Sequence, residues 1–320
     1  MTYAVAYSGG ADSTALLLML ARQHSGRVQA IHIHHGLQAA ADDFAAHCAA
    51  FCAALDVPLH VVHVDASAAT GQSPEDAARR ARYSALSGAV RDINSALAQE
   101  IWAQAAIQSI AIAQHADDQI ETLLLALSRG AGLPGLSSMA PKWQRDGIEF
   151  VRPMLGMTSF EIRSYLASLG LAARHPGSAN LGQGWVEDPT NTDTQFTRNR
   201  IRHDLIPALE KTFPQFRQTF ARSAAHAAEA QLILAQVAIE DIAKTGSPPR
   251  IGDLQGLSDE RCGNALRHWL KSAHQISPST AQLAELQSQI ANCTDRGKKI
   301  HLKVASGHVV RDGDTLAYLP

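Results

Sequence analysis

The chain has 320 residues, of which 46% are hydrophobic, with a formal net charge of −2 and four cysteines. This length suits two domains, and a charge near zero means that any RNA binding would use local basic patches. There is no apolar run of about 18 residues and no signal-peptide pattern, so we expect a cytoplasmic protein without a membrane partner. No CxxC pair occurs, which disfavours metal, iron–sulfur and redox sites.

The first 130 residues alternate short apolar runs with longer helical patterns. Strands that alternate with helices in this way form parallel sheets covered by helices on both faces. We therefore expect an α/β fold with a parallel sheet at the start of the chain. Strands are predicted at 3–8, 28–34, 59–65 and 109–115, with helices near 13–24, 40–55, 74–104 and 117–128.

The pattern changes near residue 205. Residues 206–292 are rich in Ala, Leu and Gln and predict helices, with a break at 245–253. The last 23 residues alternate polar and apolar side chains around two glycines, which predicts two or three short antiparallel strands. We therefore expect a catalytic domain over 1–205, followed by a helical segment with a small β appendage over 206–320, where tRNA would bind.

The stretch Ser8-Gly9-Gly10-Ala11-Asp12-Ser13 lies between the first predicted strand and an apolar helix. Unpaired N–H groups at a helix N-terminus bind phosphate, and glycines let the backbone approach an anion closely. Asp12 would repel phosphate by itself, so we expect it to hold Mg²⁺ or to position the loop. A P-loop requires a lysine that this segment lacks, and the GxGxxG at 130–135 follows a helix and not a strand, which disfavours dinucleotide binding.

SGGxDS after a first strand resembles the pyrophosphate-binding loop of the N-type ATP pyrophosphatases, the PP-loop superfamily, whose domains have an adenine nucleotide α hydrolase-like fold. These enzymes cut ATP between its α- and β-phosphates, adenylate a carbonyl oxygen, and let a nucleophile displace AMP. The resemblance implies ATP and Mg²⁺ as cofactors. It assigns ATP binding to Ser8, Gly9, Gly10, Ala11, Asp12 and Ser13.

Five further motifs follow in order over about the first 210 residues, and together they resemble the tRNA(Ile)-lysidine synthetase family. That resemblance implies adenylation of the C2 oxygen of the wobble cytidine in an isoleucine tRNA with a CAU anticodon. The amine of L-lysine would then displace AMP and form lysidine, which changes codon reading from AUG to AUA. The motifs are IHIHHGLQ (31–38), PEDAARRARYSAL (74–86), AQHADDQIETLLLALSRGAGLPGL (113–136), RPML (152–155) and WVEDPTNTDTQFTRNRIRHDLIPAL (185–209).

The chain departs from this family pattern in three places. Gln38 stands where the family usually has Arg, and Gln114 stands where a His or another polar residue often precedes His115. Both differences remove charge near the expected site. The stretch 84–107 is also longer than expected, and we interpret it as a helical insertion on the surface.

Acidic side chains and one histidine carry the expected chemistry. Asp118 and Glu121 are i,i+3 on a predicted helix and share a face, which suits a cationic substrate amine. His115 ends the fourth strand, where open α/β sheets place ligands, and could take a proton from the attacking amine. We therefore predict a catalytic set of Asp12, His115, Asp118 and Glu121, a lysine- or substrate-binding set of Asp117, Asp118, Glu121, Arg79 and Arg82, and metal ligation by Asp12 and Asp117.

Two basic segments are candidates for tRNA contact. Arg198, Arg200 and Arg202 suit phosphates, although an ordinary solvated helix face would look the same. A second patch, with Arg296, Lys298 and Lys299, lies beside the predicted C-terminal hairpin, where lysines equally well protect an edge strand. The expected partners are the isoleucine tRNA and L-lysine, and a homodimer stays open.

Three rival interpretations remain at this stage. A tRNA thiolase on the same fold would need paired cysteines or a cluster, and we expect Cys48 and Cys52, i,i+4 on a helix, to lie away from the loop. His32 and His34 share one strand face, but no Cys or acid completes a metal site around them. A non-catalytic nucleotide- or RNA-binding module is disfavoured by the intact acidic residues.

Overall fold

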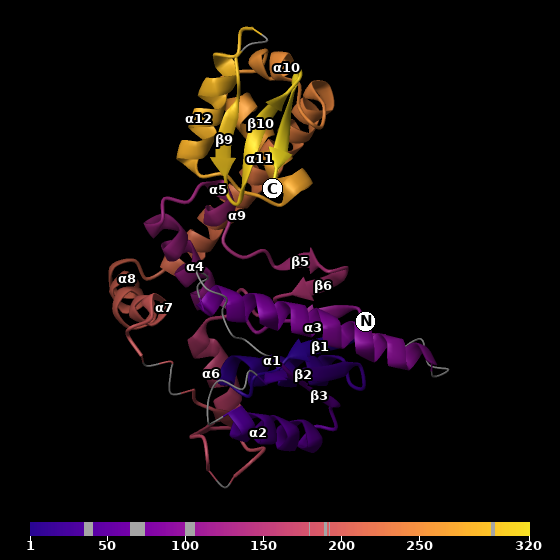
Figure 1. Cartoon of the computed structure of the whole chain (residues 1–320). Coiled ribbons are helices and arrows are strands. Elements are labelled where there is room, and N and C mark those ends of the chain that lie inside the picture. Colours follow the sequence, from indigo (N-terminus) through magenta and orange to yellow (C-terminus); the bar gives the residue numbers. More distant parts are fainter. Residues whose placement is uncertain are drawn as a thin grey trace. The chain divides into compact units, whose positions relative to one another are not determined.

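The structure is a computed structural model that describes residues 1–34, 41–64, 74–99, 106–178, 180–188, 191, 193–295 and 298–320. The chain forms two compact units (Figure 1). The first comprises Met1–Ala131 and Gly135–Ala224, and the second comprises Gly132–Pro134 and Ala225–Pro320. This division falls within helix α9 (Phe216–Thr245). The predicted division of function after residue 205 stays a prediction.

The first unit contains a six-stranded sheet with the order β3-β2-β1-β4-β6-β5. Its strand pairs are parallel except for β5 with β6, which is antiparallel. The predicted parallel sheet is therefore confirmed. The strands are β1 (Tyr3–Ala6), β2 (Val28–His34), β3 (Leu59–His63), β4 (Ser109–Ala111), β5 (Lys142–Arg145) and β6 (Ile148–Val151), and a separate parallel pair is β7 (Ala173–Arg174) with β8 (Trp185–Val186).

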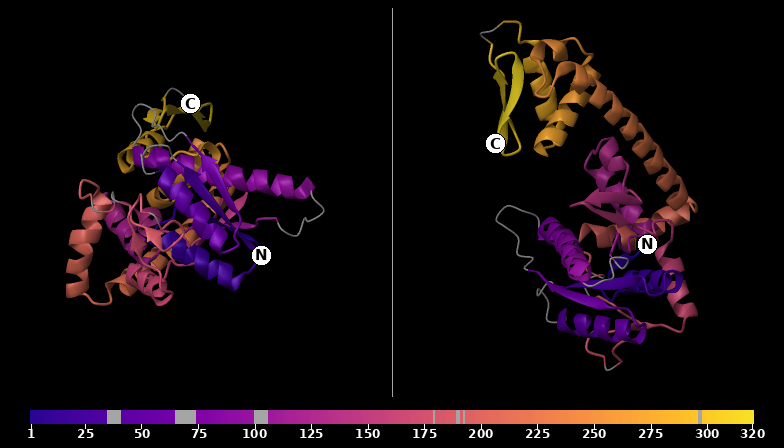
Figure 2. Two further views of the ribbon diagram at one scale, coloured as in Figure 1. Left: turned by 90° about the horizontal axis from the view of Figure 1, so that it is seen from below. Right: turned by 90° about the vertical axis from the view of Figure 1, so that its right-hand side faces the viewer.

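Helices cover both faces of this sheet (Figure 2), because alternate strand residues point to opposite sides. Ala4, Ile31 and Ile110 pack against α3, whereas Val5 and Ala111 pack against α1, α2 and α6. The central strands are thus buried on both faces and read as continuous apolar runs. The helices of this unit are α1 (Ala11–Gln23), α2 (Ala41–Ala54), α3 (Pro74–Gln99), α4 (Ala116–Ser128), α5 (Leu133–Leu136, partly assigned to the second unit), α6 (Ser159–Ser168), α7 (Thr197–Arg200), the π-helical η3 (Ile201–Leu205) and α8 (Ile206–Thr212).

Helix α3 corrects one sequence-based interpretation. It runs without a break from residue 74 to 99, and Leu86 and Val90 are 0% and 1% exposed against the sheet. Their spacing from Tyr83 keeps all three side chains on one helix face. Residues 84–99 are therefore helical as predicted, but one face of this helix packs in the core, so they are not a surface insertion. Ser73, which directly precedes α3, and the motif residues 35–38 lie outside the described residues.

A hairpin turn and a helix cap both follow from the local sequence. The β5–β6 hairpin was not predicted, although Asp146-Gly147 is a typical two-residue hairpin turn and both residues have positive φ, 52° and 78°. At the start of α6, Thr158 and Glu161 form a capping box: the Glu161 N–H donates to Thr158 Oγ1 at 3.2 Å, and the Thr158 N–H donates to Glu161 Oε2 at 2.7 Å.

The second unit packs helices against a three-stranded antiparallel sheet around the buried Trp269. The expected helical segment with a β appendage is therefore confirmed. Within the described residues, no helix has both the length and the apolar character needed to span a bilayer. The elements are α10 (Ile251–Gln255), α11 (Asp259–His274), α12 (Thr280–Ala291), β9 (His301–Val304), β10 (Gly307–Asp312) and β11 (Thr315–Leu319).

Candidate functional site

The strand order places the glycine loop and the segment that begins at His115 side by side. It reverses between β1 and β4, and ligands of open α/β sheets bind beyond the carboxyl ends of strands at such a point. The glycine loop follows β1, and His115 follows β4 and directly precedes α4. The loop and the acidic start of α4 therefore meet at the carboxyl ends of the central strands β1 and β4.

The loop has a geometry that suits an anion. Gly9 adopts a φ of +82°, and α1 begins after Gly10 with no side-chain cap. The Ser8 N–H donates to Ser13 Oγ at 3.2 Å, and the two serine hydroxyls lie 3.0 Å apart, which holds the loop closed on itself. The N–H groups of the first helical turn have no intrahelical acceptor, so they are free to bind phosphate oxygens.

Gly9→Ala should lower ATP affinity at least about tenfold, because it distorts the loop whose N–H groups contact phosphate. A Cβ at Gly9 would sit 3.1 Å from Cys48 Sγ and 3.4 Å from His47 Cδ2, in addition to the positive φ. Gly26→Ala is the matched control, since Gly26 has a φ of +70° and open space around its Cβ position. Calorimetric titration with ATP should show loss in the first variant and wild-type affinity in the second. Equal affinities would contradict a phosphate-binding role for the loop.

Cys48 corrects the expectation that the paired cysteines lie away from this loop. Its sulfur packs directly against Gly9, as the Cβ position above shows. Burial raises the pKa of both thiols, that of Cys52 to about 12, so they stay protonated near neutral pH. Reactive cysteines have depressed pKa values and some exposure. Both thiols therefore have packing roles, Cys48 against the loop and Cys52 in the hydrophobic core.

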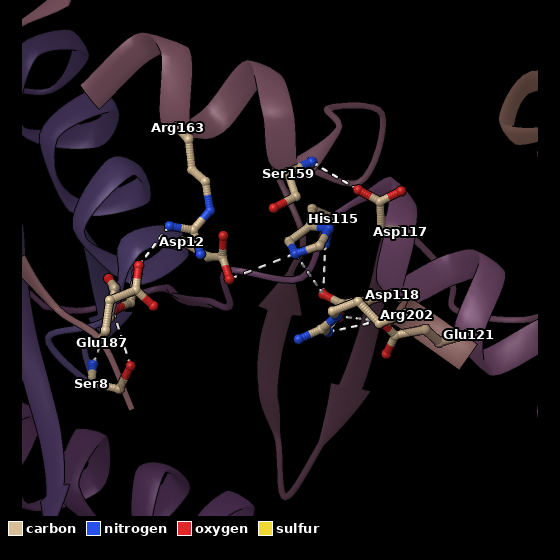
Figure 3. Close-up of polar contacts among 12 residues, drawn as sticks. Ser8, Asp12, His115, Asp117, Asp118, Glu121, Ser159, Arg163, Glu187 and Arg202 are labelled. Atoms are coloured by element: carbon tan, nitrogen blue, oxygen red, sulfur yellow. Dashed lines mark hydrogen bonds and ion pairs between the residues drawn. The ribbon is translucent and has the colours of Figure 1, made fainter. Parts of the chain in front are cut away.

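His115 connects the loop to α4. Its Nε2 atom lies 3.6 Å from Asp12 Oδ2 and 3.6 Å from Asp118 Oδ2 (Figure 3). The His115 backbone N–H also donates to Asp118 Oδ2 at 3.1 Å, which fixes the first turn of α4. Three of the four predicted catalytic residues thus meet in one place.

The charge of His115 follows from these neighbours. Burial by itself lowers the pKa of the imidazole, but the nearby carboxylates of Asp12 and Asp118 outweigh burial and raise the pKa. The ring is therefore mainly protonated over a wider pH range than a free histidine. Among the described residues its buried Nδ1 atom makes no hydrogen bond, although the ring faces the Asp118 backbone N–H at the start of α4.

Glu121, the fourth predicted catalytic residue, is fully buried and paired. Its Oε1 atom accepts hydrogen bonds from Arg202, with Nη2 at 2.7 Å and Nε at 2.8 Å. Arg202 Nη2 also lies 3.6 Å from Asp118 Oδ1. Arg202, predicted as a tRNA contact, therefore points into the acidic cluster. Glu121 Oε2 has no partner among the described residues and could accept a ligand donor.

Asp117 occupies a different environment from the one we predicted. Its Oδ2 atom accepts the Ser159 N–H at 2.8 Å, and its Oδ1 atom lies 2.5 Å from Arg217 Nε. Arg217 also pairs with Glu210 at 2.8 Å. Asp117 thus connects the start of α4 to α6 and α9. Both of its oxygens are engaged, which leaves little capacity for a metal or a lysine amine; those roles stay predictions.

Glu187 is a site residue to which sequence reasoning assigned no role. It follows β8, accepts hydrogen bonds from Arg163 at 2.6 Å and Trp185 Nε1 at 2.8 Å, and lies near enough to Asp12 for that carboxylate to raise its pKa. The hydrogen bonds to Arg163 and Trp185 outweigh burial and lower the pKa of Glu187 overall. The neighbouring Val186 N–H donates to Gly9 O at 2.9 Å. Its place in the WVEDP motif was the available signal.

The remaining predicted residues lie in separate places. Arg79 lies over the Tyr83 ring and lines a pocket between α3 and the β5–β6 hairpin, and Arg82 is exposed. Arg200 is exposed and donates to Thr197 Oγ1 at 3.0 Å, so it diverges from Arg202. In the second unit the two lysines of the predicted basic patch are exposed, while Arg296 lies outside the described residues. Those lysines are Lys298 and Lys299. Arg198, the last residue of the predicted tRNA-binding set, lies in the first unit and is half-buried.

The donor set at the site suits Mg²⁺ better than a softer metal. Asp12 has a side chain that is 40% exposed, and its carboxylate is a hard oxygen ligand beside a phosphate-binding loop. Within the described ranges, no group of three or more His, Cys, Asp or Glu residues is arranged to hold a metal by itself. His32 is instead bound locally, with Nδ1 2.9 Å from Tyr7 O. Mg²⁺ commonly takes few protein ligands and completes its shell with substrate phosphates.

Known proteins resemble this chain in both of its parts. A family model described as a PP-loop domain matches residues 1–209, and one described as a TilS substrate binding domain matches residues 250–316. The tRNA(Ile)-lysidine synthase of Polaromonas naphthalenivorans is 54% identical over 98% of this chain and 88% of its own length. That of Burkholderia pseudomallei is 40% identical over 91% of this chain, which spans 56% of that longer protein.

A solved structure shares the fold at low sequence identity. The U34-tRNA thiolase NcsA from Methanococcus maripaludis, with its [4Fe-4S] cluster, superposes with a TM-score of 0.52 at 15% identity. The match covers 72% of this chain and 73% of that one, and it supports the fold alone. The two family models and the high identities to curated relatives show which of the families with this fold the chain belongs to. The chain belongs to the tRNA(Ile)-lysidine synthase family, whose members are ligases built on a PP-loop domain.

Proposed function

We propose that this protein ligates L-lysine to C2 of the wobble cytidine in an isoleucine tRNA with a CAU anticodon, in the cytoplasm, and at the expense of ATP. The cytidine would be adenylated first, and the lysine amine would then displace AMP, so that the anticodon reads AUA in place of AUG. The observation that carries the proposal is the junction at His115, which joins the ATP loop through Asp12 to the acidic helix through Asp118.

The glycine loop is the proposed site for the phosphates of ATP. N–H groups at the start of α1 would bind the phosphates that leave as pyrophosphate, since they offset negative charge without reorganising. Asp12 would hold Mg²⁺, which supplies further charge neutralisation at the phosphates when bound. His115, whose Nε2 atom lies 3.6 Å from Asp12 Oδ2, would lie next to these phosphates.

The acidic cluster on α4 is the proposed site for L-lysine. The carboxylate of Asp118, which is partly exposed, would accept hydrogen bonds from an ammonium group, with Glu121 buried behind it. The attacking amine is a nucleophile after it loses a proton. We assign this proton to the carboxylate of Asp118, which lies 3.6 Å from His115 Nε2, while the role of His115 as the base stays a prediction.

The decisive measurement is AMP formation from ATP by the full chain with CAU-anticodon isoleucine tRNA, with and without L-lysine. We expect turnover that requires both tRNA and lysine and is absent in the blank, Asp12→Ala. Mass analysis of the digested tRNA should show cytidine converted to lysidine. Turnover with tRNA that ignores lysine would reject the proposal and direct the search to another nucleophile, sulfur first.

A further inference from the structure

A pocket of about 500 Å³ lies between α3 and the β5–β6 hairpin, apart from the groups assigned above to ATP and lysine. Four arginines and two aromatic side chains line it, where one face of the helix meets one face of the edge strand. Residues spaced i,i+4 on a helix or i,i+2 on a strand share a face, and this applies to Arg79 with Tyr83 and to Trp143 with Arg145. The six are Arg79, Arg80, Tyr83, Trp143, Arg145 and Arg152.

Aromatic rings hold three of these guanidinium groups in place. Arg152 lies 3.8 Å above the centroid of Trp143, and Trp143 stacks at 4.9 Å on Phe150 behind it. Arg145 lies 5.3 Å and Arg79 5.8 Å from the centroid of Tyr83. Side chains fixed in this way lose little further conformational entropy when a ligand binds.

Among the described residues, two pocket arginines contact neutral groups. Arg79 lies over a neutral ring, and the buried Arg152 donates to Gln114 Oε1 and Ala140 O, which are both neutral. Arg145 has a carboxylate neighbour, Asp146 at 3.5 Å. Burial lowers the pKa of Arg152, Tyr83 and Asp118 oppose that change, and the nearby Arg79 charge adds to it, so these two cations lie close enough to repel each other. An anion in the pocket would relieve this repulsion.

The pocket adjoins the catalytic groups. Gln114, which accepts a hydrogen bond from Arg152, directly precedes His115. Asp118 is close enough to act on the pKa of Arg152. The glycine loop is the site proposed above for the ATP phosphates. An RNA whose wobble base reaches His115 and Asp118 must pass its neighbouring phosphates close by.

We propose that this arginine pocket binds a backbone phosphate of the tRNA anticodon loop, next to the nucleotide that is modified. Forked guanidinium groups match phosphate oxygens, and phosphate contacts set the register of RNA without reading its sequence. The pocket would thereby position the wobble cytidine over the site. This inference rests on the proposed function, because it takes the RNA to be the tRNA substrate.

The test combines a substitution in the protein with a substitution in the RNA. It uses the full chain and a synthetic CAU anticodon stem-loop, in the absence of ATP and lysine. Arg145→Gln should weaken binding about tenfold by fluorescence anisotropy and lower the slope of log affinity against log salt by about 0.7–0.9. Arg91→Gln, an exposed residue of α3 outside the pocket, is the matched control with the same charge change. Arg145→Lys should give an intermediate loss, since it keeps the charge without the fork.

Methylphosphonate replacement of each loop phosphate in turn identifies the bound group. One position should weaken wild-type binding about as much as Arg145→Gln and add nothing in that variant. Additive losses at every position, or equal binding by Arg145→Gln and Arg91→Gln, would overturn the inference. Inorganic pyrophosphate and ATP should bind Arg145→Gln as they bind wild type; weakening confined to these small phosphates would assign the pocket to them and overturn the RNA assignment.

The two proposals can fail separately. A protein that forms no lysidine but binds the stem-loop through Arg145 would reject the lysidine proposal and leave the phosphate pocket standing. A protein that forms lysidine while Arg145→Gln binds the stem-loop like the control would reject the pocket alone. Circular dichroism of both variants checks that each is folded as wild type.

Discussion

Asp12→Asn is expected to lower the rate of tRNA- and lysine-dependent AMP formation by about a thousandfold. Asparagine keeps the size of the side chain but removes the charge that would hold Mg²⁺ beside the phosphates. The same charge raises the pKa of His115, so its loss also lowers the protonated fraction of that ring near neutral pH. The measurement is the turnover number for AMP at saturating ATP, tRNA and lysine.

Asp56→Asn is the control for this substitution. Asp56 is exposed in the turn after α2, and its φ of 55° is one that asparagine also adopts. It should keep wild-type turnover. Because Asp12 is partly exposed, Asp12→Asn should change the free energy of unfolding by less than about 1 kcal/mol. Turnover within tenfold of wild type would rule out an essential charge at Asp12.

Arg202→Gln is expected to destabilise the first unit by about 2–3 kcal/mol at pH 8, because it leaves the Glu121 carboxylate buried without its partner. Glu121 is 0% exposed, while the Arg202 side chain is 37% exposed, so the cost falls below that of breaking a fully buried pair. Urea unfolding followed by tryptophan fluorescence measures the difference in free energy of unfolding. Removing both charges, in Glu121→Gln with Arg202→Gln, should recover part of the loss.

The cost of Arg202→Gln should depend on pH in a defined direction. Burial raises the pKa of Glu121 and Arg202 opposes that rise, so the variant has a still higher pKa in the folded state. A carboxyl with a raised folded pKa costs nothing below its unfolded pKa, and stability is lost as pH rises toward the folded value. The difference from wild type should therefore be small near pH 4 and grow toward pH 8. A cost that stays constant over this range would contradict an unpaired Glu121 charge as its cause.

The sequence by itself determined the elements whose cause is local. The double glycine of the loop, the capping box at Thr158 and the acidic first turn of α4 each act over a few residues, so their spacing predicts their structure. The alternation of buried strands with helices also predicts a parallel sheet. The loop and His115 could be predicted to meet, because both follow strands whose carboxyl ends share one edge.

The tertiary structure alone decided how the charged side chains pair. Arg202 reaches Glu121 across 81 residues of sequence, and Arg217 reaches Asp117 across 100. Sequence patterns report which face of an element is buried, but not which distant cation docks beside a given carboxylate. The same reason explains why Cys48 lies beneath Gly9 and why the arginines of α3 meet those of the β5–β6 hairpin: both juxtapositions arise from how elements pack on the sheet, and no local spacing encodes them.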